Sequence, residues 1–519
     1  MPDFARTDRS RIQGIVTSGY GHMVHTAYLF YQLTGEPGSA CAWLRHLLAT
    51  DMIRSAASWR SGKGEPKIKP EFAVNIAFTH AGLGAWGLDG ATLNSFPREF
   101  ADGPANDETA EVLGDTGESG SDNWDFGGRS DPPIHLLLIV HATTCEERDR
   151  VLGILSDDIA QHADGGLIEA APRQFGKHLI HIDPVSGARV VKEHFGFNDG
   201  ISQPELKGLK TTGDSRQTKG QVASAAGEFL LGYPDEYGFY PATPLTGQVF
   251  DPQRLLAPSP YAAKHRGYRD FGYNGTYLVY RKLSQSVGRF WNYLRDQSAA
   301  IFGKDDPRFA LWLAAKMVGR WPNGVPLVAA PDLVDMTRHS DGLNDFLFAK
   351  ADPDGSRCPF GSHIRRANPR DQLKPGAPAQ SLNMTARHRI IRRGSSYGEP
   401  LFNLAILDRP DDRQALETLR QLEDDGCDRG LHFLCLNANI RRQFEFIQQS
   451  WCGFRTFNNL NSDPDPLIGD AGREEDHFTI PGHPHTLRLD GLQRFTTTRA
   501  AAYLFLPGFD TLRYLSEMP

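Results

Sequence analysis

Apolar runs with the period of a β-strand, followed by runs with the period of a helix, occur in both halves of the sequence. Side chains alternate between the two faces of a strand but repeat every 3.6 positions on a helix, so the two patterns predict different elements. The runs of the first half are 27–34, 38–52, 71–79, 134–142, 145–159 and 178–184. Those of the second half are 275–283, 284–296, 431–439, 440–451 and 496–508. Each half therefore predicts one β-α-β-β-α-β module, which makes the fold class α+β.

A Pro-rich connector at residues 245–267 separates the two modules. We therefore expect an N-terminal domain over 1–245, which contains the stretch GFNDG, and a C-terminal domain over 246–519. Residues 100–133 are rich in Gly, Asp, Glu and Ser and are expected to form a surface insertion, and residues 209–224 a flexible polar loop. Long loops of this kind on a compact scaffold are either functional or disordered.

Composition narrows the classes of function. Charged residues make up 23% of the chain, hydrophobic residues 39%, and the net charge is −7, which is typical of a globular protein and argues against a nucleic-acid partner. No run of about 18 apolar residues is present, so no membrane span is expected. The six cysteines form no CxxC pair, and the N-terminal stretch MPDFARTDRSRIQG has no apolar signal region. Together these features predict a reducing, cytoplasmic location.

The stretch GFNDG, which runs from Gly196 to Gly200, allows two interpretations. Asn, Asp and Gly favour a turn, and a turn is the commoner explanation of one short motif. Alternatively, the two glycines let the backbone approach a flat group closely while Asp199 points at that group. The stretch alone leaves both interpretations open.

Two further stretches contain groups suited to an anionic, metal-bearing ligand. In residues 358–370, His363 lies among several arginines, and in residues 388–398 Arg392 and Arg393 are adjacent. A single His is usually structural, and clustered arginines often form a solvated face. However, arginines are bidentate partners for carboxylates such as the haem propionates, and a neutral imidazole is a common axial ligand of haem iron. An arginine turned inward would bring a permanent positive charge into such a site.

Taken together, the chain resembles the dye-decolourising peroxidase family. The resemblance rests on GFNDG at 196–200, on FGSHIRRANPR at 360–370 and on IIRRGSSYG at 390–398, and it covers most of the chain. The length and the insertions resemble the larger, multi-insertion branch of that family. The resemblance implies two ferredoxin-like modules of the dimeric α+β barrel type with long loop insertions and one haem. This agrees with the two modules expected from periodicity.

The resemblance also implies roles for individual residues. It makes His363 the axial ligand of the haem iron, Asp199 the distal acid–base residue and Arg392 the distal cation. Further contacts with the haem are implied for Gly196, Phe197, Gly200, Arg320, Arg370, Leu431 and Phe433. The acid that supports the second nitrogen of the axial His stays open between Asp463, Asp465 and Glu445. Ser396 stands where family members often have Pro, so the loop behind Arg392 is expected to be loose.

These roles imply a peroxidase with one haem b per chain, acting as a monomer or homodimer. It would reduce hydrogen peroxide and oxidise dyes, phenolics or other bulky aromatic donors in one-electron steps, with an acidic optimum because an Asp base is ionised in mild acid. The alternatives are a non-catalytic haem-binding or haem-transfer protein and a chlorite dismutase-like enzyme, although the latter has no use for GFNDG. Electrons could leave through surface aromatics, for which the candidates are Trp291, Trp321, Trp451, Tyr273 and Tyr397, although core packing is the commoner role at any single one of these positions.

Overall fold

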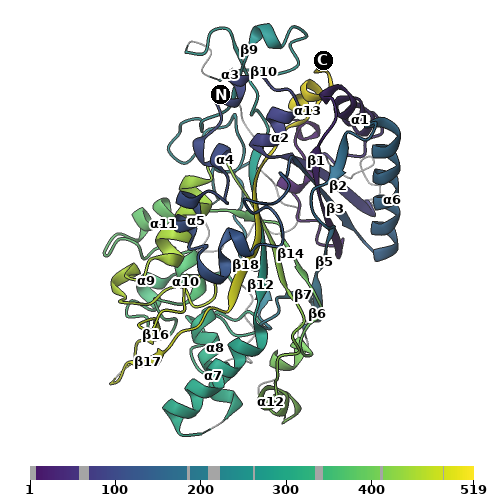
Figure 1. Ribbon diagram of the computed structural model, residues 1–519. Coiled ribbons are helices and arrows are strands. Elements are labelled where there is room, and N and C mark those ends of the chain that lie inside the picture. The colour runs from purple at the N-terminus through teal and green to yellow at the C-terminus, as the bar shows by residue number, and fades with distance from the viewer. Residues whose placement is uncertain are drawn as a thin grey trace.

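The structure is a computed structural model that describes residues 8–57, 69–183, 187–208, 223–260, 264–304, 306–333, 343–408, 413–482 and 484–518. A long twisted sheet runs through the middle of the molecule, with helices on both sides (Figure 1). Residues 209–222, which include most of the predicted polar loop, lie outside the described residues. No helix of the described residues is long and apolar enough to cross a membrane.

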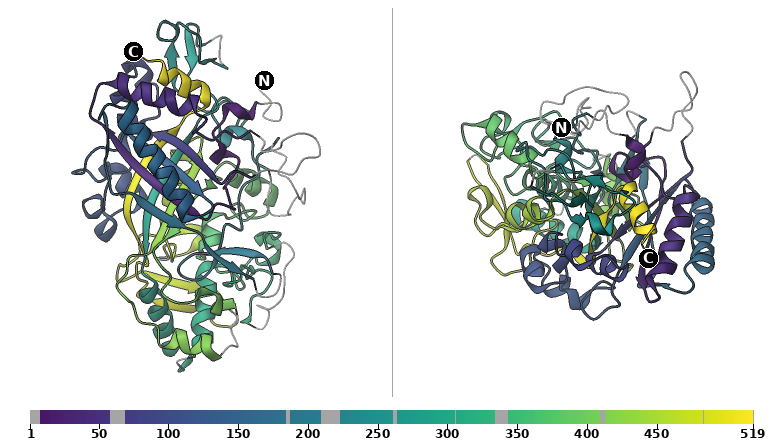
Figure 2. Two further views of the ribbon diagram at one scale, coloured as in Figure 1. Left: turned by 90° about the vertical axis from the view of Figure 1, so that its right-hand side faces the viewer. Right: turned by 90° about the horizontal axis from the view of Figure 1, so that it is seen from above.

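The N-terminal module has the strand order of a ferredoxin-like sheet. Its strands are β1 (His25–Leu33), β2 (Phe72–Phe78), β3 (Leu136–Ala142), β4 (Leu167–Glu169) and β5 (Gln174–Lys177), in the order β2-β3-β1-β5, with β4 also paired to β1. The pairs are antiparallel. The two crossover helices, α1 (Pro37–Ala49) and α6 (Cys145–His162), cover the outer face of this sheet (Figure 2).

The fourth strand of this module differs from the sequence prediction. Residues 178–184 were expected to close the sheet, but β5 does so, and β6 (Leu179–Ile182) pairs with β7 (Arg189–Lys192) in a separate small sheet. β5 has the sequence QFGK, which gives almost no apolar signal. Its Gly176 lies against the Thr26 and Ser395 side chains, so the position accepts only a residue without a Cβ atom. The segment that pairs at this edge of the sheet is therefore determined by close packing of Gly176 and not by hydrophobicity.

The C-terminal module repeats the same order. Its strands are β12 (Thr276–Gln285), β13 (Ile391–Arg392), β14 (Ser395–Tyr397), β15 (Gly430–Asn437) and β18 (Thr496–Leu506), in the order β18-β12-β15-β14, with β13 also on β15. The helices α7 (Val287–Phe302) and α8 (Pro307–Val318) follow β12. The helix after β15 is of the wide π type over Arg441–Glu445 and Ile447–Gly453.

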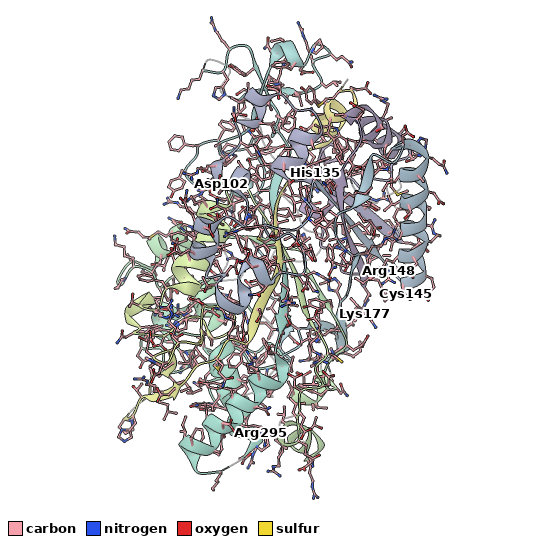
Figure 3. The ribbon with its side chains drawn as sticks, in the orientation of Figure 1. Asp102, His135, Cys145, Arg148, Lys177 and Arg295 are labelled. Atoms are coloured by element: carbon pink, nitrogen blue, oxygen red, sulfur yellow. The ribbon has the colours of Figure 1, made fainter. Side chains whose placement is uncertain are left out.

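The two sheets join at both edges. Phe505 of β18 pairs with Phe78 of β2, and Ser396 of β14 pairs with Lys177 of β5. Eight of the described strands thus close into a ring with buried aromatic and aliphatic side chains inside it, among them Tyr28, Phe30, Tyr280, Leu434 and Leu436. Figure 3 shows Lys177 at one seam, beside Arg148 of α6. The fold prediction is confirmed: the chain is α+β, with two ferredoxin-like modules in a barrel. The boundary between 245 and 246 remains a prediction.

The remaining elements cover the ends of the barrel. The helices are α2 (His80–Ala85), α3 (Gly90–Leu93), α4 (Arg98–Asp102), α5 (Asp107–Leu113), α9 (Phe348–Ala351), α10 (His363–Ala367), α11 (Pro378–Ala386), α12 (Arg413–Arg420) and α13 (Phe509–Ser516). The strands are β8 (Asn198–Asp199), β9 (Leu245–Gly247), β10 (Ala257–Pro258), β11 (Tyr268–Asp270), β16 (His477–Ile480) and β17 (Leu487–Asp490). Residues 100–133 were expected to be an irregular insertion, but they contain α5 and the end of α4.

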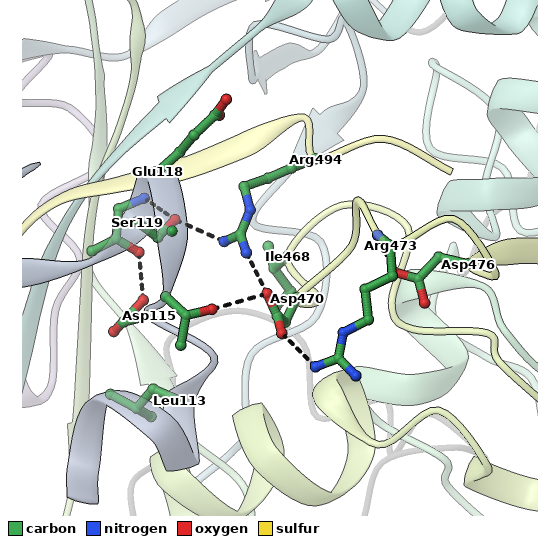
Figure 4. A network of polar contacts seen from close by, with 12 residues as sticks. Leu113, Asp115, Glu118, Ser119, Ile468, Asp470, Arg473, Asp476 and Arg494 are labelled. Carbon is green, nitrogen blue, oxygen red and sulfur yellow. Dashed lines mark hydrogen bonds and ion pairs between the residues drawn. The ribbon is translucent and has the colours of Figure 1, made fainter. Parts of the chain in front are cut away.

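A polar network fastens this insertion to the C-terminal module (Figure 4). Thr498 of β18 donates a 2.8 Å hydrogen bond to Asp115, whose carboxylate also pairs with Arg281. Asp470 accepts hydrogen bonds from Thr116 at 3.4 Å and from Arg494. The carboxylates of Asp115 and Asp470 are paired with arginines and are largely withdrawn from water. Such ion pairs fix the relative positions of the segments that they join. The insertion is therefore an integral part of the fold.

We expect Gly176→Ala to lower the free energy of unfolding by about 1–3 kcal/mol, because the new methyl group overlaps the Thr26 and Ser395 hydroxyls at the seam. Denaturant titration measures the change. The control is Gly153→Ala inside α6, where an added Cβ meets no described atom within 4 Å. That variant should gain up to about 1 kcal/mol from helix propensity. Equal effects of the two substitutions would contradict a tightly packed seam.

Candidate active site

Asp199 and Arg392 meet although 193 residues separate them in the sequence. Arg392 Nη1 donates to Asp199 Oδ1 at 2.8 Å, and Arg392 Nη2 donates to the Ser202 carbonyl at 3.3 Å. Asp199 belongs to β8, which pairs with β7, and Arg392 belongs to β13 at the edge of β15. The pair therefore joins the two modules across the ring.

The backbone around GFNDG is held by two charged residues that precede it, the half-buried Glu193 and the buried Lys192. The Glu193 carboxylate accepts the N–H groups of Phe195 and Phe197, both at 2.9 Å. Lys192 Nζ donates to the Gly196 carbonyl at 3.0 Å and forms a buried ion pair with Asp408 at 2.8 Å. These bonds fix the turn, so Asp199 is presented from a rigid support.

Gly196 and Phe197 of this motif, which were predicted to contact a cofactor, contact other residues of the protein. Gly196 has a φ of +102°, and a Cβ there would collide with Leu407. Phe197 is 4% exposed and lies in an apolar cluster with Phe195 and Phe290. Gly200 has no described atom within 4 Å of a Cβ position. The two interpretations of GFNDG are therefore compatible, because the stretch forms a turn and that turn holds the Asp199 carboxylate in place.

Arg392 is also fixed through its own backbone. The Gln203 side chain accepts the Arg392 N–H at 3.1 Å and donates to the Arg392 carbonyl at 3.3 Å. Arg393 points the other way and donates to the carbonyls of Ile15 and Val16 at 2.6 and 3.1 Å. Gln203 was not identified from the sequence, although it follows GFNDG by three residues, because a Gln in a loop has no distinguishing pattern.

The expectation of a loose loop behind Arg392 is wrong. Ser396 is 3% exposed and pairs with both Leu431 of β15 and Lys177 of β5. The neighbouring Ser395 hydroxyl lies 2.8 Å from the Thr26 hydroxyl and 3.0 Å from the Tyr28 hydroxyl. Pairing on both sides, and side-chain hydrogen bonds across the seam, hold this segment without the rigidity of a proline ring.

His363 is the first residue of α10 and is hydrogen-bonded to Asp465. Its Nδ1 lies 3.0 Å from Asp465 Oδ2, and the carboxylate fixes Nδ1 as the protonated nitrogen. Burial opposes the charged imidazolium, but the Asp465 charge outweighs burial and raises the pKa of His363. The other two candidate acids have different partners: Asp463 pairs with His477 at 3.1 Å, and Glu445 accepts the Tyr503 hydroxyl at 3.0 Å.

We refer to the region around His363, Asp199 and Arg392 as the recess. Their side chains are 27%, 39% and 33% exposed, yet burial is the largest influence on the pKa of both His363 and Asp199. The charges of Arg392 and Asp199 also act on His363, so the distal pair lies within electrostatic range of the imidazole.

The charges of the recess favour an ionised Asp199. Burial raises the pKa of a carboxyl group, but Arg392 and the Gly200 N–H outweigh burial and lower the pKa of Asp199 below 3.8. The ion pair therefore stabilises the folded protein above that pH, and this contribution is lost as the pH falls through the lowered pKa. The arrangement can accept a proton next to a permanent cation.

Arg389 is a half-buried cation that was not identified from the sequence. Among the described residues no carboxylate pairs with it, and its guanidinium group donates to the Ser202 hydroxyl at 3.5 Å. Burial and the nearby Arg392 lower the pKa of Arg389 to about 10. The turn before β13 interrupts the strand pattern, so spacing alone did not indicate which way Arg389 points. A cation that is partly withdrawn from water and has no carboxylate partner is suited to an anionic ligand.

Arg320 and Arg370 are engaged elsewhere. Arg320 donates to the carbonyls of Gly324 and Leu343 at 2.9 and 2.6 Å, and Arg370 donates to the carbonyls of Asn344 and Phe346 at 2.9 and 2.6 Å. These bonds tie both guanidinium groups to the main chain, so their assignment as carboxylate partners remains a prediction without support from the contacts.

Two apolar residues of β15 lie on the expected face. Leu431 and Phe433 are half-buried, while His432 between them is buried and contacts the Tyr280 hydroxyl at 2.9 Å on the opposite face. The exit through surface aromatics lacks support, because Trp291, Trp321, Trp451 and Tyr397 are all less than 9% exposed and Tyr273 is half-buried.

The donor set fits a haem. His363 has one nitrogen held by a carboxylate, and no described residue is hydrogen-bonded to Nε2, which is the arrangement of an axial imidazole ligand. Arg389, which is half-buried and has no carboxylate partner among the described residues, could pair with a propionate. Asp199 and Arg392 supply a base and a cation within electrostatic range of that imidazole. The residues present are therefore compatible with an iron porphyrin in the recess.

Comparison with known proteins points to one family. No protein-family model matches the chain. Peroxidase 2 of Mycetinis scorodonius is 30% identical over 476 residues, covering 86% of this chain and 76% of the relative. The dye-decolorizing peroxidase of Mycena epipterygia is 30% identical over 436 residues, covering 81% and 67%. A solved ancestral D-type dye decolorizing peroxidase is 26% identical, with a TM-score of 0.72 and 98% of each chain covered. The enzyme from Auricularia auricula-judae, at 23% identity and a TM-score of 0.73, has the same fold.

We expect Arg392→Leu to raise the pKa of Asp199 above 3.8, because the cation is lost while burial remains. An NMR titration of haem-free protein with labelled aspartate carboxyl carbons measures it, with Asp199→Asn to assign the signal. Arg393→Leu is the control and should leave this pKa unchanged, since Arg393 contacts the backbone near Val16. An unchanged pKa in both variants would show that the ion pair does not hold Asp199 ionised.

Proposed function

The chain belongs to the dye-decolourising peroxidase family, and on that premise we propose that it is a haem peroxidase in which Asp199 and Arg392 activate hydrogen peroxide. The observation that supports these roles is the 2.8 Å ion pair in the same recess as His363. His363 would hold the iron, with Asp465 fixing its tautomer, and Arg389 would hold a carboxylate of the haem. When bound, haem supplies the iron at which peroxide is reduced and the oxidising equivalents that donors then remove.

Asp199 would move the proton that the reaction requires. Its carboxylate accepts the proton from one peroxide oxygen and returns it to the other, which leaves as water. Because the pKa of Asp199 is lowered, the base is ionised in mild acid, which supports an acidic optimum. Arg392 would stabilise the negative charge on the departing oxygen, as a cation already held in place by Ser202 and Gln203.

The donors are proposed to be dyes, phenolics or other bulky aromatic compounds, oxidised one electron at a time. We further propose haem b as the form of the cofactor, one per chain, in a monomer or homodimer. A cytoplasmic location is proposed on the basis of the six cysteines, all of which are free, since a reducing compartment keeps thiols unpaired.

We expect Asp199→Asn to retain haem and to react with one equivalent of peroxide about 10²–10⁴-fold more slowly, because an amide cannot accept the proton. Stopped-flow absorbance in the Soret region measures the rate. Asp149→Asn, at an exposed position of α6, is the matched control and should react at the rate of the unaltered protein. A haem carrier would bleach slowly in all three proteins, and a normal rate in Asp199→Asn would reduce Asp199 to a turn residue.

We expect His363→Ala to fold but to contain little haem, because the axial ligand is gone. The ratio of Soret to protein absorbance gives the haem content, and circular dichroism verifies the fold. His485→Ala, an exposed histidine, should bind haem fully. Full occupancy with an unaltered spectrum in His363→Ala would place the ligand at another histidine.

A further inference from the structure

Three potential metal ligands lie together on the outer face of the N-terminal module. His46 is in the last turn of α1, and Asp158 and His162 are in the last turns of α6. The two helices lie side by side on the far side of the barrel from α10, which holds His363 (Figures 1 and 2). The cluster is therefore separate from the candidate active site.

The geometry of the cluster comes from both helices. Asp158 and His162 are four residues apart, so their side chains project from the same face of α6. The rings of His46 and His162 are stacked, with centroids 4.0 Å apart and an interplanar angle of 26°. His46 Nε2 lies 3.5 Å from Asp158 Oδ1, and one donor atom from each of the three residues lies within 4.8 Å of the other two.

Apart from the contact between His46 and Asp158, these donor atoms have no polar partner among the described residues. No hydrogen bond of the three side chains is found there, although the Asp158 side chain is only 14% exposed. The 3.5 Å separation is long for an N–H···O hydrogen bond. It is close to the separation of about 3.4 Å between two ligands bound at 2.0–2.1 Å to a tetrahedral Zn²⁺.

We propose that His46, Asp158 and His162 bind one first-row transition-metal dication, with Zn²⁺ as the best match, and that water completes the coordination. Two imidazoles and one carboxylate are ligands that Zn²⁺ accepts, and three protein ligands leave one position open. The nitrogen lone pair lies in the plane of an imidazole, so binding requires one of the stacked rings to turn toward the ion. The bound ion would fasten α1 to α6.

The test is calorimetric titration of Zn²⁺ into the haem-loaded protein, without a polyhistidine tag and after treatment with a chelator. We expect one site, and a rise in the thermal unfolding midpoint with Zn²⁺ because the ion binds only the folded arrangement. His46→Ala, His162→Ala and His162→Gln should each weaken binding by more than the roughly 10–100-fold that loss of an outer-shell partner costs. His485→Ala is the control and should bind Zn²⁺ normally.

Two results would overturn the proposal. The first is the absence of a binding heat in the unaltered protein, which would make the stacked histidines a packing contact only. The second is equal Zn²⁺ affinity in His46→Ala, His162→Ala and the control, which would place the ion elsewhere. The Gln variant preserves helix propensity at 162, so a loss of affinity shared with His162→Ala cannot be attributed to unfolding of α6.

Discussion

Closure of the strand ring is the constraint on which the candidate site depends. Two ferredoxin-like sheets each have exposed edges, and unpaired strand edges are costly or prone to association. Here the pairs Phe505–Phe78 and Ser396–Lys177 join the edges of one sheet to those of the other. The second pair places the strands after Arg392 against the segment that leads to Asp199. Residues from the two halves therefore meet because the sheets close, and not because any local sequence brings them together.

The charges around the recess follow from this closure. Asp199 is a single carboxylate facing Arg392, with Arg389 nearby and without an acidic partner in the described residues. The surplus of positive charge on this side suits a ligand that carries carboxylates. On the other side, the Asp465 carboxylate balances the charge of His363. Burial tends to raise the pKa of Asp465, but His363 and Arg366 lower it more strongly, so this pKa lies below its usual value. The site thus gives Asp199, the proposed proton acceptor, and His363, the proposed metal ligand, a separate counter-charge each.

The sequence predicted most of the barrel strands because they are long apolar runs, as in β12 and β18, where most residues are buried. It misplaced β5, since four residues that include Gly176 give no apolar alternation. Motifs indicated Asp199, His363 and Arg392, each of which has an unusual residue type in a distinctive context. The motifs did not distinguish Asp465 from Asp463, and they did not indicate Gln203 and Arg389. These residues contact the site only because the folded chain brings them close to it, and no sequence pattern records that proximity. Arg320 and Arg370, whose roles remain predictions, show the same limit, since the sequence reveals a charge but not which carbonyl groups it contacts.

The same reasoning applies to the insertion at 100–133, which sequence composition presented as peripheral. Asp465 accepts the N–H of Leu467 at 2.9 Å, and its carbonyl accepts the N–H of Gly469 at 3.0 Å, so the segment from 465 to 470 is one tight turn. The end of that turn, Asp470, is held by Arg494 and by Thr116 of the insertion. The insertion therefore supports the acid that orients His363. Because Thr116 and Arg494 both hold Asp470, the end of this turn cannot shift freely. The position of Asp465 at the start of the turn is restrained as well, and with it the hydrogen bond between His363 and Asp465.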